Sequence, residues 1–167
     1  MENIRLLDCT LRDGGYINQW DFGEKTIKSI IARLMEAGTD IIEVGFLRNC
    51  TWEKDKTLFP SMKELRKLLP KNPGNTQFGA MILHNQYDVE KLEPCDGTVN
   101  IIRVTFHDYD IQEGLAFCAK VKAKGYQLFV NPINIMGYSD QQLLQLLEKV
   151  NHLHPYGFSI VDTFGSM

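Results

Sequence analysis

Six short apolar runs, none of which alternates with polar residues, constrain what this chain can fold into. Runs of this kind, rich in Ile, Val and Phe, are typical of strands that are covered on both faces, as in a parallel sheet. The predicted strands are Ile4–Leu7, Asp40–Val44, Phe78–Leu83, Asn100–Thr105, Gln127–Val130 and Phe158–Val161. The sequence therefore predicts an α/β protein.

Segments with helical spacing lie between these runs, and three of them carry an apolar stripe. The stripes are Ile27, Ile30, Ile31 and Leu34 before Gly38; Leu115, Cys118, Ala119 and Val121 before Gly125; and Leu143, Leu144, Leu147 and Val150, opened by Ser139 and Asp140 as a cap and closed near Gly157. The stretch 70–75, rich in Pro, Asn and Gly, predicts a helix-to-strand loop.

The strands start roughly 31 residues apart on average, which is the size of one strand–helix unit. Six such units in series are compatible with a doubly wound open sheet or with part of a TIM (β/α)₈ barrel. Only Gly14-Gly15 follows the first strand, where a dinucleotide-binding fold would carry G-x-G-x-x-G. We therefore predict a single catalytic barrel domain over residues 1–167, with about the first six βα units and without strands 7 and 8.

Charge and hydropathy narrow the classes of function. The chain has 167 residues and a net charge of −3, so it lacks the basic surface that binds nucleic acid or an anionic membrane. We see no signal peptide at the start and no apolar run long enough for a membrane span, and we expect a cytoplasmic protein. The four cysteines form no C-x-x-C pair and are expected to be reduced, with Cys9 facing the core.

Polar residues end every predicted strand, at the edge where parallel α/β folds place their chemistry. They are Asp8, Arg12 and Asp13; Glu43; His84 and Asn85; Thr105 and His107; Asn131; and Asp162 and Thr163. The segment Asp8-Cys-Thr-Leu-Arg12-Asp13-Gly-Gly stands out because it places two carboxylates and a guanidinium at the end of a buried strand. Charges in such a place must be paired, solvated or bound to a metal.

The run Asp8-Cys-Thr-Leu-Arg-Asp-Gly resembles the D-x-T-x-R-D-G signature of the DRE-TIM metallolyases, the family of 3-hydroxy-3-methylglutaryl-CoA lyase. Ile41-Ile-Glu43-Val-Gly-Phe is similar to the strand that supplies the family's glutamate, and Val161-Asp-Thr-Phe-Gly-Ser-Met167 to its V-D-S-x-G segment. The resemblance runs over essentially the whole chain and is nearest to the 4-hydroxy-2-oxovalerate aldolase type.

This resemblance implies a site and a reaction. Arg12 would stabilise an enolate, Asp13 would be a ligand to Mg²⁺ or Mn²⁺, and Glu43 would hold Arg12 in place. Asp8 would support the loop through hydrogen bonds. The implied reaction is retro-aldol cleavage of a 4-hydroxy-2-oxo acid through a metal-bound enolate, with His107, Asn131 and Thr163 as candidate substrate-binding residues.

The sequence departs from the family pattern in two places. Tyr16 stands where the aldolases carry a catalytic histidine, and a phenol with a pKa near 10 is a poor base unless a metal or a cation lowers it. We retain Tyr16 as a candidate catalytic residue. The family's H-x-H metal ligands lie on strand 7, beyond Met167, so we expect residues 1–167 to be inactive by themselves.

The histidines and one charged segment allow more than one interpretation. His152 and His154 resemble an H-x-H pair but follow a helix, which predicts solvated or capping side chains at the opposite face of the barrel. A pocket-facing role and a loop hydrogen bond are equally compatible with His84 and His107. The segment Trp52-Glu-Lys-Asp-Lys predicts a solvated loop or, as the alternative, a lid over the site.

The sequence is compatible with three functions. The first is a metal-dependent aldolase or lyase acting on a small 2-oxo acid, as a homo-oligomer. The second is an acyl-CoA/2-oxo acid condensing acyltransferase of the same family. The third is a non-catalytic α/β binding fragment.

Overall fold

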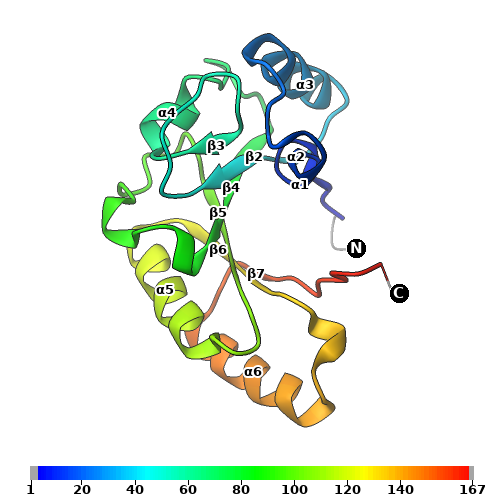
Figure 1. The fold of residues 1–167 in the computed structure, drawn as a ribbon, viewed down its shortest axis with the longest axis vertical. Coiled ribbons are helices and arrows are strands. Elements are labelled where there is room, and N and C mark those ends of the chain that lie inside the picture. Colours follow the sequence, from blue (N-terminus) through cyan, green and yellow to red (C-terminus); the bar gives the residue numbers. More distant parts are fainter. Residues whose placement is uncertain (1–3, 166–167) are drawn as a thin grey trace.

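The computed structural model describes residues 4–165, which form one curved parallel sheet with helices on its outer face (Figure 1). Six strands lie side by side in the order β1 (Leu7–Asp8), β2 (Ile41–Leu47), β4 (Gln77–Leu83), β5 (Ile101–Phe106), β6 (Gln127–Pro132) and β7 (Gly157–Phe158). A further two-residue strand, β3 (Leu58–Phe59), pairs with β2 beside this path. The architecture is a parallel α/β half-barrel, the first part of a TIM barrel, as predicted.

The central strands are the best buried part of the molecule. Every residue of β2 is buried, and β4 and β5 are nearly as well covered. Helices α3 (Glu24–Glu36), α5 (Ile111–Ala123) and α6 (Asp140–Leu153) follow the pattern of strand-to-helix units. Burial on both faces of the strands explains why their sequences show continuous apolar runs instead of alternation.

The first and last strands are shorter than predicted and shifted. The chain pairs as β1 only at Leu7–Asp8, and Ile4 and Leu6 are exposed. The last pairing covers Gly157–Phe158, whereas the prediction placed a strand at Phe158–Val161. Both strands have a single neighbouring strand among residues 4–165, so fewer ladder hydrogen bonds define their limits.

Two of the three predicted helix stripes need correction. In α5 the buried side chains include Phe117, and Ala119 is exposed. In α6 the buried side chains are Leu146 and Val150, whereas Leu144 is 63% exposed. Both helices are turned relative to the predicted stripe, because packing on the curved sheet selects among neighbouring apolar positions.

The ends of α6 show one confirmed expectation and one correction. Ser139 accepts a hydrogen bond from the Gln142 backbone and forms a reciprocal capping box with it. The helix ends at Leu153 and is capped by His154 in the left-handed conformation (φ 45°), before the predicted stop near Gly157. Gly157 itself lies in β7.

Short elements follow the carboxyl ends of the strands and surround the site. Helices α1 (Thr10–Asp13) and α2 (Gly15–Asn18) come after β1, and the 3₁₀ turns η1 (His84–Gln86) and η3 (Ile135–Gly137) come after β4 and β6. Helix α4 (Met62–Arg66) precedes the loop predicted at 70–75, and η2 (Val89–Lys91) precedes β5. These short elements were not predicted.

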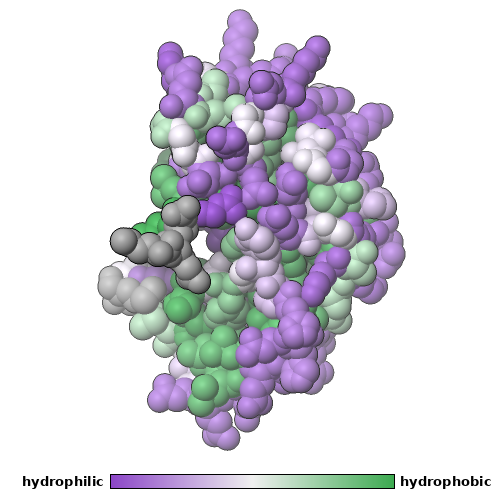
Figure 2. All heavy atoms as spheres, turned by 180° about the vertical axis from the view of Figure 1, so that it is seen from behind, coloured by the Kyte–Doolittle hydropathy of each residue, from purple (hydrophilic) through white to green (hydrophobic). Residues whose placement is uncertain are grey.

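The surface is uneven in character. From behind, the part over α3 and α4 is mainly hydrophilic, whereas hydrophobic side chains gather toward α6 and the end of the chain (Figure 2). The exposed large apolar residues there include Met136, Leu144, Tyr156 and Ile160. Among residues 4–165, no helix combines the length and hydropathy needed to cross a membrane. All four cysteines are free thiols, as expected.

Candidate active site

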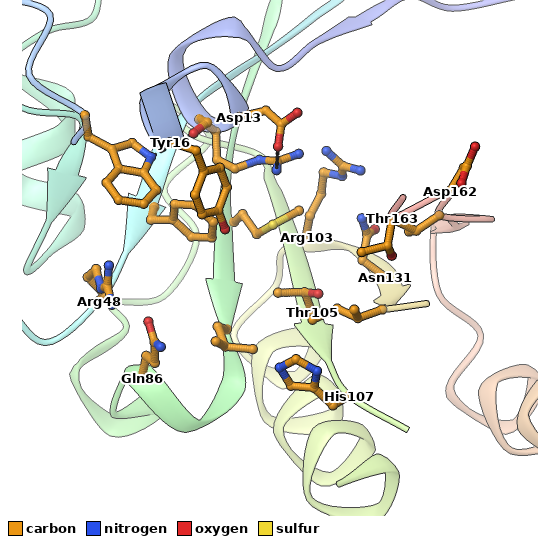
Figure 3. Close-up of a pocket in the computed structure, with 17 residues that line it drawn as sticks. Asp13, Tyr16, Arg48, Gln86, Arg103, Thr105, His107, Asn131, Asp162 and Thr163 are labelled. Atoms are coloured by element: carbon orange, nitrogen blue, oxygen red, sulfur yellow. Dashed lines mark hydrogen bonds and ion pairs between the residues drawn. The ribbon is translucent and has the colours of Figure 1, made fainter. Parts of the chain in front are cut away.

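A cavity of about 650 Å³ opens at the carboxyl ends of the strands (Figure 3). It brings together six of the seven predicted site residues, namely Arg12, Asp13, Tyr16, His107, Asn131 and Thr163. The seventh, Glu43, is fully buried next to Arg12 and does not line the cavity. Residues from α1, α2, β6 and the segments after β5 and β7 therefore converge on one site, as the strand-end pattern predicted, while their chemical roles stay predictions.

One buried carboxylate holds two arginines at the inner end of this cavity. The Nε atom of Arg12 donates to Oε1 of Glu43 at 2.5 Å, and a terminal nitrogen of Arg103 donates to Oε2 at 2.9 Å. Glu43 has no exposed surface, and both arginine side chains are nearly buried. Each carboxylate oxygen thus fixes one guanidinium, so the expected positioning of Arg12 by Glu43 has a direct geometric basis.

A local irregularity in β2 follows Glu43 and leads to Phe46, which lines the cavity. The pairing register with β4 shifts between Glu43 and Phe46, which changes the alternation of side chains along the strand. Gly45 lies at this shift, where a Cβ atom would stand 2.1 Å from the Thr57 carbonyl oxygen. Because the Phe46 amide donates to this same oxygen at 3.0 Å, the close approach of Thr57 requires glycine at position 45.

The buried cluster shifts the pKa values of its members. Burial by itself would lower the pKa of Arg12, but the charge of Glu43 and its hydrogen bond outweigh burial and raise this pKa above its ordinary value. Burial, followed by the charge of Glu43, raises the pKa of Cys9 to about 11. Cys9 lies 3.2 Å from a guanidinium nitrogen of Arg103, so it faces the charged cluster and not the apolar core that we expected.

Asp13 is the exposed carboxylate of the site. One of its oxygens accepts a hydrogen bond from Arg12 at 2.5 Å, and its side chain is 65% exposed. Residues 4–165 include no group of three His, Cys, Asp or Glu side chains placed to hold a metal ion. Asp13 can supply one ligand, but the described residues do not complete a metal site.

An aromatic wall stands beside Arg12. Tyr16, Trp20 and Phe46 form edge-to-face contacts with ring centroids 4.8–6.4 Å apart, and all three line the cavity. The Trp20 indole donates to the Arg12 carbonyl at 2.7 Å, and the Arg12 guanidinium lies 5.8 Å from the centre of the Phe46 ring. Tyr16, 64% exposed, therefore forms part of the cavity wall.

Polar groups with fixed orientation form the opposite wall. Asn131, at the end of β6, is buried and accepts a hydrogen bond from the Ser159 hydroxyl at 2.6 Å. The Thr163 hydroxyl accepts from the Asn134 backbone at 2.7 Å. Thr105, near the carboxyl end of β5, also lines the cavity. These contacts orient side chains that are able to hydrogen bond to a ligand's oxygens.

The histidines separate into two pairs. His107 lines the cavity and stacks on Tyr109 with ring centroids 4.8 Å apart, whereas His84 lies 3.5 Å from Asp110 and outside the cavity lining. His152 and His154 lie at the end of α6, before β7 begins. They are exposed at the opposite edge of the sheet, as predicted.

Two predicted loop features, the support by Asp8 and the segment 52–56, can be compared with the structure. The Asp8 carboxylate accepts hydrogen bonds from the backbone and hydroxyl of Thr10, which is the supporting role expected of it. In the segment 52–56, Asp55 accepts backbone hydrogen bonds from Phe22 and Gly23 and so fixes the start of α3. This segment does not line the cavity in this structure, and the lid alternative stays a prediction.

Sequence reasoning missed three cavity residues that carry charge or polarity: Arg48, Gln86 and Arg103. Arg103 could have been found from the sequence, because it is the only charged residue within the apolar strand Ile101–Phe106. Arg48 follows β2 and Gln86 lies in a 3₁₀ turn, where polar residues are common and carry no such signal.

Comparison with known proteins extends the description of the fold. The N-terminal domain of a putative aldolase from Bacteroides vulgatus matches with a TM-score of 0.63 and 22% identity, over 92% of this chain and 61% of that one. A truncated 3-deoxy-D-arabino-heptulosonate 7-phosphate synthase from Thermotoga maritima matches with a TM-score of 0.52 and 13% identity, over 83% and 45%. No family model and no curated protein matches the sequence.

These similarities place the chain among proteins with an aldolase-like TIM-barrel fold. At this level of identity they concern the fold alone. The chain spans less than two thirds of the length of each of the two matched structures.

Proposed function

We propose that the protein is a divalent-metal-dependent aldolase or lyase that cleaves a carbon–carbon bond in a 2-oxo acid, of the 4-hydroxy-2-oxo acid type. The observation that carries the proposal is the Arg12–Glu43–Arg103 cluster at the inner end of the cavity. A preorganised guanidinium in a sheltered site stabilises negative charge on oxygen as that charge develops. Further support comes from the resemblance of the Asp8–Gly14 segment to the DRE-TIM signature.

The cleavage can be written with this chain's residues in position. A base takes the proton of the 4-hydroxyl, the C3–C4 bond breaks, and its electron pair forms the enolate of the shorter 2-oxo acid while C4 leaves as an aldehyde carbonyl. Arg12 faces the developing enolate oxygen, and a proton then returns to C3. Tyr16 is our candidate for the proton-transfer group because it lines the cavity beside Arg12.

The metal is part of the proposal and rests on Asp13. A Mn²⁺ or Mg²⁺ ion would act as a Lewis acid toward the 2-oxo group. Asp13 would provide one ligand from its exposed position at the cavity, and the other ligands would come from the substrate or from outside the described residues.

Exchange of the methyl protons of pyruvate in D₂O tests enolate formation without knowledge of the aldehyde partner. In the intact gene product we expect exchange, followed by proton NMR, that depends on added Mn²⁺ or Mg²⁺ and stops on chelation. An Arg33→Gln variant, altered on the exposed side of α3, serves as the control and retains the rate. Absence of exchange with either metal would contradict the proposed function.

A further inference from the structure

A third arginine lines the cavity apart from the Arg12–Glu43–Arg103 cluster. Arg48 follows directly after β2 and lies beside Gln86, across the cavity from Asn131 and Thr163 (Figure 3). Within residues 4–165, the Arg48 guanidinium has neither a hydrogen-bond nor an ion-pair partner. A half-buried cation without a counter-charge, at the wall of a cavity, is a ready site for an anion.

The main chain around Arg48 is fixed from two directions. The Arg48 amide donates to the Phe59 carbonyl of β3 at 3.0 Å, and the Asn49 amide donates to the Gln86 carbonyl at 2.8 Å. The second bond ties the η1 turn to the end of β2 and so keeps Gln86 next to Arg48. The main-chain positions of Arg48 and Gln86 are therefore fixed relative to each other.

The position of Arg48 relative to Arg12 sets the spacing of two cationic groups. Arg48 is the second residue after Phe46, which lies near the end of β2, so their Cα atoms are about 7 Å apart in an extended chain. Both residues line the cavity. The Arg12 guanidinium lies 5.8 Å from the centre of the Phe46 ring, so Phe46 is close to Arg12 in space and to Arg48 along the chain. A short carbon chain packed along Phe46 would reach from one guanidinium to the other.

Three other arginines, Arg12, Arg103 and Arg66, show how Arg48 differs from an arginine that is paired within the chain. Arg12 and Arg103 share Glu43, and Arg66 pairs with both Glu93 and Asp96 near the surface. In each case carboxylates of this chain offset the charge. Arg48 has no such partner among the described residues, so its charge is available to a ligand.

We propose that Arg48, with the amide of Gln86, binds a second anionic group at the far end of the substrate. The inference rests on the proposed function, in which the Arg12 end of the cavity receives the 2-oxo acid group. The substrate class is then a 2-oxo acid whose other end carries a carboxylate or a phosphate ester, because both present paired oxygens to a guanidinium fork.

Calorimetric titration of the intact gene product with three 2-oxo acids in the presence of Mn²⁺ tests this site. 2-Oxopentanoate lacks a distal anion, 2-oxoglutarate carries a distal carboxylate, and 3-phosphooxypyruvate carries a distal phosphate. We expect at least one dianion to bind about ten- to a hundred-fold more tightly than 2-oxopentanoate. The dianion that binds better identifies the source of the second charge.

Substitution at position 48 provides the decisive comparison. Arg48→Gln should remove the preference for the dianion and leave the affinity for 2-oxopentanoate unchanged, and Arg48→Lys should retain part of the preference. Arg33→Gln, which removes the same charge from the exposed side of α3, should retain all of it. Equal binding of all three acids by the unaltered protein, or equal weakening of all three by Arg48→Gln, would overturn the proposal.

Failure of the proposed function would give a result that differs from failure of the Arg48 site. If none of the 2-oxo acids binds, the aldolase proposal fails, and inorganic phosphate becomes the probe for the anion site. Phosphate binding that Arg48→Gln or Arg48→Lys weakens supports the site. The absence of phosphate binding to the unaltered protein overturns it.

Discussion

Arg12 Nε and Glu43 Oε1 lie 2.5 Å apart, in a contact that joins the helix after the first strand to a completely buried position in the second. Because Glu43 also accepts from Arg103 on β5, a single carboxylate ties three neighbouring segments of the barrel together. The cluster therefore has a role in stability as well as in any chemistry at the cavity.

Removal of the Glu43 charge should be costly. In a Glu43→Gln variant the two guanidiniums lose the buried charge that they share, and we expect the free energy of unfolding to fall by about 3 kcal/mol. Urea denaturation followed by circular dichroism measures the change. Glu36→Gln, which removes an exposed carboxylate paired with Arg33, is the matched control and should have little effect. A similar small effect of both substitutions would show that the cluster does not stabilise the fold.

Arg12→Lys should separate rate from affinity. Lysine keeps the positive charge but loses the planar fork that contacts Glu43 and Asp13 and that, in our proposal, binds a ligand oxygen. We expect the rate of pyruvate methyl exchange in the intact gene product to fall on the order of 10² to 10³-fold, with pyruvate affinity nearly unchanged. A lysine variant as fast as the original protein would remove Arg12 from the mechanism.

Gly45→Ala tests the close approach in β2. The added Cβ would meet the Thr57 carbonyl oxygen at 2.1 Å, so we expect a loss of about 3 kcal/mol in the free energy of unfolding. Gly74→Ala is a useful comparison, because its Cβ would meet no atom within 4 Å and only the positive φ of 58° opposes it. There the expected loss is about 1 kcal/mol. Equal losses in thermal or urea unfolding would contradict the packing argument.

The thiol of Cys9 should ionise late. Its pKa is raised from 9.0 to about 11, so alkylation by iodoacetamide, followed by peptide mass spectrometry, should rise with a midpoint near pH 11. Between pH 9 and 11 the unfolded chain releases this proton first, and stability should therefore fall as the pH rises through that window. Cys9→Ala should remove this part of the fall. Rapid alkylation of Cys9 at pH 8 would refute the assignment.

The His152/His154 pair should have no part in metal binding. Both residues lie at the end of α6, on the opposite edge of the sheet from Asp13. In the intact gene product, the double variant His152→Ala/His154→Ala should retain its Mn²⁺ content, whereas Asp13→Asn should lose it. Elemental analysis of the purified proteins decides between the two sites.

Much of the architecture could be predicted from the sequence, because local sequence patterns and tertiary structure agree in the central strands. The runs around Ile41, Phe78 and Ile101 are buried on both faces, and continuous apolar sequence predicts that condition well. At the ends of the sheet the pattern was a poorer guide: Ile4 and Ile160 are apolar but exposed, since pairing with a neighbour, and not composition, sets strand limits there.

The site was predictable to the extent that parallel strands bring their carboxyl ends together. Asp13, His107 and Asn131 could be found in this way. Arg48 could not, because the role that we propose for it rests on its having no carboxylate partner among residues 4–165, which is a property of the folded surroundings and not of neighbouring residues in sequence. The place of Phe46 at the cavity likewise depends on a register shift after Glu43, which only strand pairing reveals.

The sharing of Glu43 by two guanidiniums also bears on how pH profiles of this protein should be interpreted. The raised pKa of Arg12 means that no proton leaves this guanidinium in the range where proteins work, so the inner end of the cavity is a constant source of positive potential. Acid and alkaline limbs of an activity profile must then be assigned to the ligand or to other groups around the cavity. Mutations that alter the shape of such a profile will identify the proton carrier, and those at Arg12 will change only its height.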